Sequence, residues 1–315
     1  MSDLCLVTGG AGFIGSHLVD GLLRGGRAVR VLDDFSTGLR ENLSHQGSRI
    51  EVVEGSVNDP SAVAKAVRGA RHVFHLGALA SVARSVEAPL VSHAACATGT
   101  LTVLDESRKA GVKRVVYAAS SSAYGGYSTE EGQTEELLPN AMSPYAAAKL
   151  AGEYYMQAFA ETYGIETVRL RFFNIFGPRQ RADSPYSGVI AIFTAAMQKG
   201  TPPTVHGDGL QSRDFTYVAN CVQAIIKASE ALGVSGKVFN VGTGRSVTVL
   251  ELVAALNKLL GTSLSPKHSD PRAGDVRYSK ADITRTRKEL GYEPSVAFEP
   301  GLAKTLAWYK GEKWE

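Results

Sequence analysis

The hydrophobic positions in the first half of the chain form short apolar runs separated by longer amphipathic segments. The runs lack period-two alternation, which is typical of parallel strands buried on both faces of a sheet. Between them lie segments with helical spacing, of which 101–110 is the clearest and ends at Gly111. Strands that alternate with helices predict a doubly wound, Rossmann-type α/β fold, whose ligands bind beyond the carboxyl ends of the strands. The predicted strands are residues 4–8, 29–33, 50–54, 73–76, 114–118 and 168–172.

After Phe173 the alternation becomes less regular, glycine and proline become more frequent, and charged residues appear singly in loops. This pattern predicts a smaller C-terminal α/β lobe that closes over the carboxyl edge of the sheet and binds a substrate. The elements predicted in this half are helices at 218–232, 249–260 and 299–310 and a strand at 238–241.

Composition narrows the class of protein. The chain has 315 residues, 44% of them hydrophobic, and a net charge of +3 without a basic run, so neither nucleic acid nor an anionic membrane is an expected partner. The longest apolar run, 188–197, is too short to span a bilayer. Three widely spaced cysteines, Cys5, Cys96 and Cys221, indicate buried thiols in a reducing compartment. We therefore expect a cytoplasmic protein without metal ligands or disulfides.

A glycine-rich turn, GGAGFIG at residues 9–15, joins the first predicted strand to the first helix and fits G-x-G-x-x-G. Glycines allow backbone amides at a helix N-terminus to approach a pyrophosphate. Asp33 ends the second strand, where an acid binds the ribose hydroxyls, and together with Asp34 it would repel a 2′-phosphate. The turn therefore predicts a dinucleotide site that prefers NAD to NADP. The alternative for Asp33 is a carboxylate that only caps a turn.

Residues 143–155, SPYAAAKLAGEYY, predict a helix that begins at Pro144, whose fixed φ suits a first turn. Tyr145 and Lys149 lie four residues apart and therefore share one face. A phenol has a pKa of about 10, and an ammonium ~4 Å away at an effective dielectric of ~20 would lower it by about three pH units. The pair therefore suggests a tyrosine that acts as a base. Taken in isolation, a partly exposed aromatic beside a solvated lysine would be the commoner arrangement.

Together with the glycine turn and Asp33, two segments resemble the extended short-chain dehydrogenase/reductases: YAASSSAYGG at 117–126 and SPYAAAK at 143–149. Three others resemble more narrowly the UDP-hexose 4-epimerases: RFFNIFGPRQ, GDGLQSRDFTYV and GDVRYSKAD. The similarity extends over nearly the whole chain. It implies an isomerase that binds NAD tightly and a UDP-sugar transiently.

The resemblance implies that Ser120, Tyr145 and Lys149 are the catalytic residues. Tyr145, ionised with the help of Lys149 and the nicotinamide charge, would take the proton of the sugar 4-hydroxyl while hydride leaves C4 for NAD⁺. Ser120 would hydrogen-bond the same oxygen, and Lys149 would also bind the nicotinamide ribose. The 4-keto sugar would then turn over and receive hydride on its other face.

The resemblance also implies the residues that contact each ligand. Those for NAD are Gly9, Gly12, Phe13, Ile14, Gly15, Asp33, Asp34, Ser36, Thr37, Gly38, Ser56, Val57, Leu76, Ala78, Ala80, Tyr145, Lys149 and Phe172. Those for the UDP-sugar are Ser121, Ser122, Asn174, Gly188, Val189, Thr204, His206, Arg213, Arg272, Asp275 and Ser279.

Within the substrate set, the resemblance assigns Arg213 and Arg272 to the phosphates, Asp275 to the uridine ribose and Ser279 to the wall beside the sugar C2 substituent. Thr204 and His206 would line the uracil pocket, and Asn174 would touch the diphosphate. Arg179 and Arg277 receive no role.

For the domains, the resemblance implies an NAD-binding domain over 1–175, to which 214–243 returns, and a nucleotide-sugar lobe over 176–213 and 244–315. A homodimer would form through helices 101–110 and 146–163.

The sequence departs from the family pattern at three positions. Ser56 stands where relatives usually carry an Asp that binds the adenine amino group, and Cys96 where they usually carry Asn. Ala80 stands where some epimerases have a lysine. None of these positions holds a catalytic group.

Two other functions fit parts of the pattern. Nucleotide-sugar dehydratases and decarboxylases share the NAD site but need an acid after the catalytic Ser/Thr, where this chain has Ser121 and Ser122. A UDP-glucuronate 4-epimerase differs from the preferred interpretation only in its sugar. A non-catalytic dinucleotide-binding regulator is a third alternative, but it would not need Ser120, Tyr145 and Lys149 together.

Overall fold

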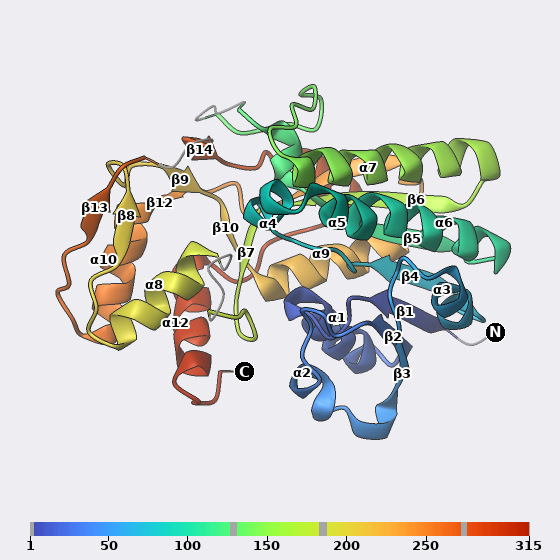
Figure 1. The fold of residues 1–315 in the computed structure, drawn as a ribbon, viewed down its shortest axis with the longest axis horizontal. Helices are drawn as coiled ribbons and strands as arrows, with labels where there is room; N and C mark the ends of the chain where they lie inside the picture. Colours follow the sequence, from blue (N-terminus) through green and yellow to red (C-terminus); the bar gives the residue numbers. More distant parts are fainter. Residues whose placement is uncertain (1–2, 127–130, 183–187, 272–275, 315) are drawn as a thin grey trace.

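The computed structural model describes residues 3–126, 131–182, 188–271 and 276–314 (Figure 1). Its larger part is built on a seven-stranded sheet in which every neighbouring pair is parallel. The doubly wound α/β prediction is therefore confirmed. In the order β11-β6-β5-β4-β1-β2-β3, the strands are Lys237–Val241, Glu166–Phe172, Arg114–Ser120, His72–His75, Leu4–Thr8, Ala28–Asp33 and Ile50–Glu54.

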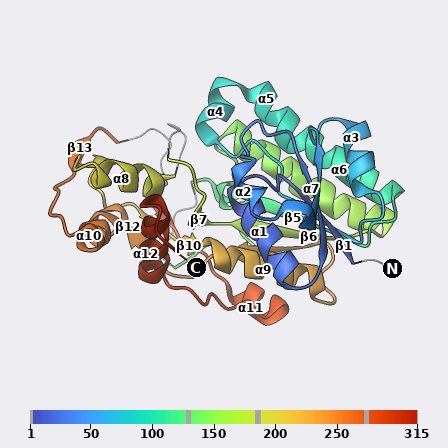
Figure 2. The same cartoon turned by 90° about the horizontal axis from the view of Figure 1, so that it is seen from below.

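Helices cover both faces of this sheet, and each face has its own hydrophobic core. On one face α1 (Phe13–Arg24) contacts α9 (Val218–Glu230), and their apolar side chains enclose a cluster with β1 and β11 (Figures 1 and 2). On the other face α6 (Gly99–Lys109) lies between α3 (Pro60–Val67) and α7 (Pro144–Tyr163), over a second cluster. Both faces are buried, which explains why the strands read as continuous apolar runs.

Shorter elements connect these helices to the sheet. The helix predicted at 101–110 is preceded by a π-helical stretch, Ala94–Thr98, at which the chain continues from α5 into α6. These shorter elements are α2 (Glu41–Ser44), η1 (Gly47–Arg49), α4 (Val82–Glu87), α5 (Pro89–His93) and the 3₁₀ turn η3 (Ser121–Tyr124).

The smaller lobe consists of three helices and short strand pairs packed around Phe176, Phe215 and Phe298. Its helices are α8 (Val189–Gln198), α10 (Val249–Leu260) and α12 (Phe298–Tyr309). Its strand pairs are β7 (Asn174–Phe176) with β10 (Phe215–Tyr217), β8 (Thr204–His206) with β13 (Lys267–Ser269), and β9 (Ser212–Arg213) with β12 (Val247–Thr248) and β14 (Tyr278–Ser279).

One helix of the C-terminal segment lies elsewhere than expected. α11 (Thr284–Leu290) falls within 244–315, which was assigned to the smaller lobe, but it packs against β11 and α9 (Figure 2). Leu290 enters the core below the large sheet, so apolar burial draws this helix to the larger part of the molecule. Across the described residues, no helix is both long and apolar enough to cross a bilayer.

Candidate active site

The glycine turn between β1 and α1 forms a cradle that side chains would obstruct. Gly9 has φ +68°, a left-handed conformation that favours glycine, and a Cβ on Gly15 would lie 2.1 Å from the Gly9 carbonyl oxygen. Gly12 caps α1 in an extended conformation without a side-chain hydrogen bond to the first turn. The turn therefore packs backbone against backbone at the helix N-terminus, an arrangement that lets a pyrophosphate approach the first amides of α1.

Asp33 holds this turn in place. Its Oδ2 accepts a hydrogen bond from the Ala11 N–H and its Oδ1 accepts one from the Phe35 N–H, both at 2.9 Å. Burial raises the pKa of the Asp33 carboxyl. The two N–H donors lower this pKa and the nearby Asp34 raises it, both by less than burial does. A Cβ on Gly38 would lie 2.9 Å from Asp33 Oδ1. The capping function considered as an alternative is thus present, and it places a carboxylate beside the glycine turn.

The other predicted cofactor residues lie in loops that follow neighbouring strands. Two of these loops are in direct contact, because a Cβ on Gly77 would lie 2.9 Å from a methyl of Val57. The strand ends therefore bring together segments that are distant in sequence. Asp34, Ser36, Thr37 and Gly38 follow β2; Ser56 and Val57 follow β3; Leu76, Ala78 and Ala80 follow β4; and Phe172 ends β6.

The three proposed catalytic residues converge at the ends of β5 and α7. Ser120 ends β5 and Tyr145 lies in the first turn of α7, and the Ser120 hydroxyl acts on the phenol by lowering its pKa. Ser122 donates to Ser120 Oγ from its backbone N–H at 3.2 Å and its hydroxyl at 2.9 Å. These two donors leave the Ser120 proton available for the Tyr145 oxygen.

The electrostatics of Tyr145 differ from the expectation. Lys149 Nζ donates to the Ala118 carbonyl at 2.8 Å and lies 4.9 Å from the centre of the Tyr117 ring. Burial raises the pKa of the Tyr145 phenol, opposed by the Ser120 hydrogen bond, and burial lowers that of Lys149. Lys149 is not among the groups that act on the Tyr145 phenol, so the predicted lowering of its pKa by Lys149 is not found in the protein alone, where desolvation dominates.

Sequence reasoning missed a buried chain of hydrogen bonds beneath this site. His75 Nδ1 lies 2.8 Å from Thr8 Oγ1 and its Nε2 lies 3.0 Å from Thr100 Oγ1. The Thr100 hydroxyl donates to the Cys96 carbonyl at 2.6 Å, so its oxygen accepts a hydrogen bond from His75 Nε2–H. His75 Nδ1 is then unprotonated and accepts from the Thr8 hydroxyl. The Thr8 oxygen in turn accepts the Gly77 N–H at 3.0 Å. Burial lowers the pKa of His75 to about 3. A neutral imidazole on β4 thus links the end of β1 to α6.

The substrate residues lie mostly in the smaller lobe. Arg213 on β9 pairs with Ser279 on β14, and Ser279 is buried. His206 on β8 contacts Ser269 through its Nδ1, 2.8 Å from Ser269 Oγ. The remaining predicted substrate residues lie at the starts of elements: Ser121 and Ser122 in η3, Asn174 in β7, Gly188 and Val189 at the N-cap and first residue of α8, and Thr204 in β8. Arg272 and Asp275 lie outside the described residues.

Asp214, which the sequence analysis did not single out, joins the segments that carry these groups. Its buried carboxylate accepts hydrogen bonds from the backbone N–H groups of Thr243 and Gly244 at 2.8 and 2.9 Å, and from that of Ala281 at 3.2 Å. Its own N–H donates to the Ser279 carbonyl at 2.7 Å. The RDF stretch that contains Asp214 was noted only for its arginine.

The two arginines without an assigned role form ion pairs instead. Arg179, with φ +66°, binds Asp20 on α1 at 2.8 Å, and both side chains are nearly buried. Arg277 binds Asp208 at 2.7 Å at the surface. Of the family departures, Ser56 Oγ accepts the Asn58 N–H at 3.2 Å, and the Cys96 thiol donates to the Leu79 carbonyl at 3.8 Å.

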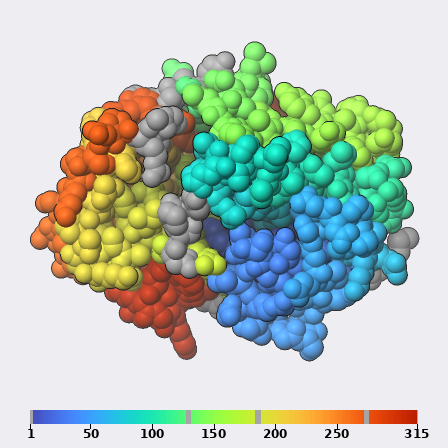
Figure 3. All heavy atoms as spheres, viewed as in Figure 1, coloured from blue at the N-terminus to red at the C-terminus, as the bar shows by residue number. Residues whose placement is uncertain are grey.

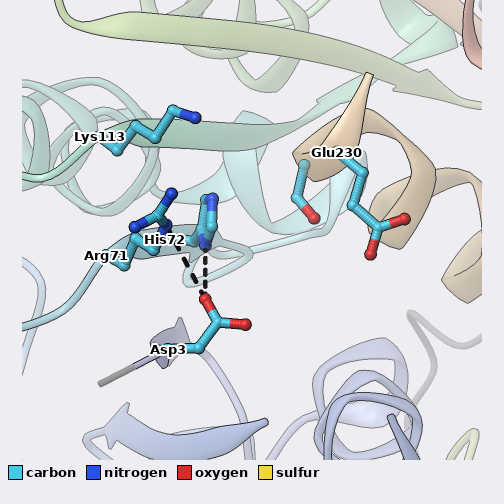
Figure 4. A pocket seen from close by; sticks show the side chains of 6 residues that line it. Asp3, Arg71, His72, Lys113 and Glu230 are labelled. Atoms are coloured by element: carbon cyan, nitrogen blue, oxygen red, sulfur yellow. Dashed lines mark ion pairs between the residues drawn. The ribbon is translucent and has the colours of Figure 1, made fainter. Parts of the chain in front are cut away.

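The surface of the molecule is hollowed between the nucleotide domain and the smaller lobe (Figure 3). A different cavity, of about 370 Å³, lies at the amino ends of the strands (Figure 4). There Asp3 Oδ1 lies 3.6 Å from His72 Nδ1 and 4.0 Å from Arg71 Nε. Parallel α/β sheets bind ligands at the opposite edge, so this cavity is not the candidate site. In the part of the chain that is described, no cluster of three His, Cys, Asp or Glu side chains could hold a metal ion.

Comparisons with known proteins agree with this geometry. The sequence profile of the NAD dependent epimerase/dehydratase family matches residues 5–242. A UDP-glucose 4-epimerase of Mycolicibacterium smegmatis is 37% identical over 310 residues, and the match covers 98% of each chain.

Two solved structures have the same fold over their full length. UDP-glucose 4-epimerase of Thermotoga maritima with UDP-glucose is 38% identical, with a TM-score of 0.93 over 98% of this chain and 99% of that one. UDP-N-acetylglucosamine 4-epimerase of Methanobrevibacter ruminantium in complex with UDP-N-acetylmuramic acid is 36% identical, with a TM-score of 0.93 over 99% of both chains.

Proposed function

The chain belongs to the NAD dependent epimerase/dehydratase family, and we propose that it is an isomerase that inverts C4 of a UDP-hexose. Two features carry this proposal. Ser120 ends β5 close to the first turns of α7, which carry Tyr145 and Lys149. The next two positions, Ser121 and Ser122, have hydroxyl side chains where an eliminating enzyme would need a carboxylate. Elimination or decarboxylation needs a further acid there, and its absence from these two positions favours return of the hydride to the same carbon.

NAD, when bound, accepts the hydride of C4 and returns it. The glycine turn, Asp33 and the loops after β3 and β4 would hold this cofactor, and the absence of side chains at Gly9 and Gly15 lets the turn pack tightly against α1, whose N-terminus suits a pyrophosphate. The carboxylates of Asp33 and Asp34 favour a free ribose 2′-hydroxyl over a 2′-phosphate.

The side chains of the site move the proton. Tyr145 in its phenolate form accepts the proton of the sugar 4-hydroxyl and later returns it to the 4-keto oxygen. Ser120, which already acts on the phenol, donates to the oxygen that carries the negative charge at each stage. Lys149 is fixed by the Ala118 carbonyl and adds a buried positive charge that favours the phenolate.

The substrate is proposed to be UDP-glucose or UDP-galactose, with UDP-N-acetylglucosamine as a further substrate. Ser279 is a small side chain beside Arg213, so the wall it forms leaves room for an N-acetyl group. Arg213 would bind the diphosphate as a planar, permanently charged fork. Both named structural relatives contain UDP-sugars as ligands, one of them acetylated.

We further propose a cytoplasmic homodimer in which α6 and α7 of each subunit pair. α7 exposes three large aromatic side chains, Tyr154, Tyr155 and Tyr163, and such a surface suits a helix of a second subunit. We propose an NAD-binding domain over 1–175 with 214–243 and a nucleotide-sugar lobe over 176–213 with 244–315, with two exceptions: α11 packs on the large sheet, and the β7–β10 pair packs in the core of the smaller lobe.

The proposed function is tested by incubating the purified protein separately with UDP-glucose, UDP-N-acetylglucosamine and UDP-glucuronate and separating each 4-epimer by chromatography. The Tyr145→Phe variant removes the ionisable oxygen and should lower turnover at least ~1,000-fold while retaining NAD and the fold. Equal turnover by this variant would remove Tyr145 from the mechanism. A 4,6-dehydrated or decarboxylated product would replace the epimerase assignment.

A further inference from the structure

One turn beyond Lys149 on α7, a buried ion pair joins this helix to β6. Arg171 donates from Nε to Glu153 Oε1 at 2.9 Å and from Nη2 to Glu153 Oε2 at 2.8 Å. The side chains are 4% and 3% exposed, respectively, so both charges are removed from water. Two parallel hydrogen bonds fix the relative orientation of the two groups. Neither residue has a role in the chemistry described above.

The same arginine also contacts the segment that follows Ser120. Its guanidinium lies 4.7 Å from the ring centre of Tyr124, the last residue of η3, and this ring is completely buried. The Tyr124 hydroxyl donates to Asn240 on β11 at 2.6 Å. Arg171 thereby connects α7, which carries Tyr145 and Lys149, to the 3₁₀ turn that begins directly after Ser120.

The approach of α7 to the sheet is close at this point. A Cβ on Gly152 would lie 2.4 Å from the Tyr117 hydroxyl, which itself donates to the Lys149 carbonyl at 3.3 Å. A small rotation of α7 would therefore move the Tyr145 and Lys149 side chains relative to Ser120. The bidentate pair with Arg171 opposes that rotation.

Positive charge exceeds negative charge around this pair. Lys149, Arg169 and Arg171 are buried cations, and Arg169 Nη1 lies 3.3 Å from the Glu153 carbonyl oxygen. Glu153 acts electrostatically on Lys149 and raises its pKa, against the larger effect of burial. Other titratable groups in this environment include Tyr117 on β5, Tyr124 on η3, His75 on β4, Cys96 on the π-helical stretch, Tyr154 on α7 and Glu135, which acts on Tyr124.

We propose that Glu153 and Arg171 are positioning residues for the reaction, which hold α7 against the Ser120 segment and balance each other's charge beside Lys149 and Tyr145. This inference rests on the proposed function, in which Tyr145 must lose its proton. It extends that function, because neither residue touches the reacting atoms. Removing one partner alters the net charge around the phenol, whereas removing both restores it.

The two single variants should move the titration of Tyr145 in opposite directions. Glu153 follows Tyr145 by eight residues, or ~12 Å along the helix, where a unit charge at an effective dielectric of ~20 changes a titration midpoint by about one pH unit. Glu153→Gln removes a negative charge and should lower the midpoint by about that amount. Arg171→Met removes a positive charge and should raise it by a similar amount.

The readout is the tyrosinate absorbance of NAD-saturated protein against pH, taken as the difference from the same protein carrying Tyr145→Phe. This measurement needs no turnover, so it remains interpretable if the proposed substrate proves wrong. Under the proposed function, the acidic limb of kcat should move in the same directions, with KM for the UDP-sugar unchanged.

Two further variants keep the test decisive. The double variant Glu153→Gln/Arg171→Met leaves neither member of the pair as an unpaired buried charge, should fold more readily than Arg171→Met alone, and should return the midpoint to the wild-type value. Glu166→Gln is the matched control. It breaks the 2.7 Å Arg114–Glu166 pair, which also involves β6 but joins it to β5 at their amino ends, ~20 Å from Ser120.

Opposite shifts in the single variants, cancellation in the double variant and no shift in Glu166→Gln would support the proposal. Shifts of the same sign, or midpoints that do not move, would overturn it. So would an equal shift in Glu166→Gln, since that would indicate a general loosening of the sheet.

Discussion

The buried imidazole of His75 makes a quantitative prediction about acid stability. In an unfolded chain a histidine has a pKa near 6.5, whereas burial and the nearby Lys149 lower the pKa of His75 to about 3. Between these values the unfolded chain binds one more proton than the folded protein. The contribution of neutral His75 to the free energy of unfolding is therefore complete above pH ~6.5. It is lost progressively as the pH falls toward 3.

The magnitude follows from the size of the shift. Each pH unit in this window costs about 1.4 kcal/mol per histidine, so His75 alone lowers the free energy of unfolding by about 2.7 kcal/mol between pH ~6.5 and ~4.5. His17 and His72, with pKa values lowered to about 4 by burial, act in the same direction. Against a typical total of about 5–15 kcal/mol, the three together should bring the wild-type protein close to unfolding near pH ~4.5.

The assay is urea unfolding of the NAD-free protein at constant ionic strength across this pH range. His75→Gln should be less stable at pH 7.5, by about 1–2 kcal/mol, because the hydrogen bonds to Thr8 and Thr100 are altered. It should then lose about 2.7 kcal/mol less than wild type on acidification. His93→Gln, on the exposed surface of α5, is the control and should follow wild type. Parallel pH curves for His75→Gln and wild type would show that His75 is not a buried neutral group.

Three further expectations follow from the site. Nucleotide released from the denatured protein should be NAD, because Asp33 and Asp34 would face a 2′-phosphate; recovery of mainly NADP would contradict this assignment. Ser279→Tyr should lose turnover of UDP-N-acetylglucosamine and keep that of UDP-glucose. If the ratio of kcat/KM values for the two sugars is the same in variant and wild type, Ser279 does not limit substrate size. Light scattering at micromolar concentration should give the mass of a dimer, and a monomer would refute the pairing of α6 with α7.

The sequence by itself determined the local elements and the place of the cofactor turn. The helix predicted at 249–260 agrees with the structure at both ends because its signals are local: Thr248 and Glu251 form a capping box, and Gly261 ends the helix with φ +67°. GGAGFIG was recognisable for the same reason, since the conformation of a tight turn depends on residues within that turn. The parallel sheet followed from the alternation of strands and helices, because burial on both faces leaves a compositional pattern in each strand.

Only the tertiary structure decided the electrostatics of the site. Tyr145 and Lys149 share a helix face as predicted, but the Lys149 ammonium binds the Ala118 carbonyl of β5, and burial, not Lys149, dominates the pKa of the phenol. The partner of Glu153 lies on β6, 18 residues away. Burial and charge pairing depend on which strands become neighbours, and spacing along one helix contains no information about them. The sequence therefore predicted which side chains react, whereas the fold determined the protonation and orientation of those side chains.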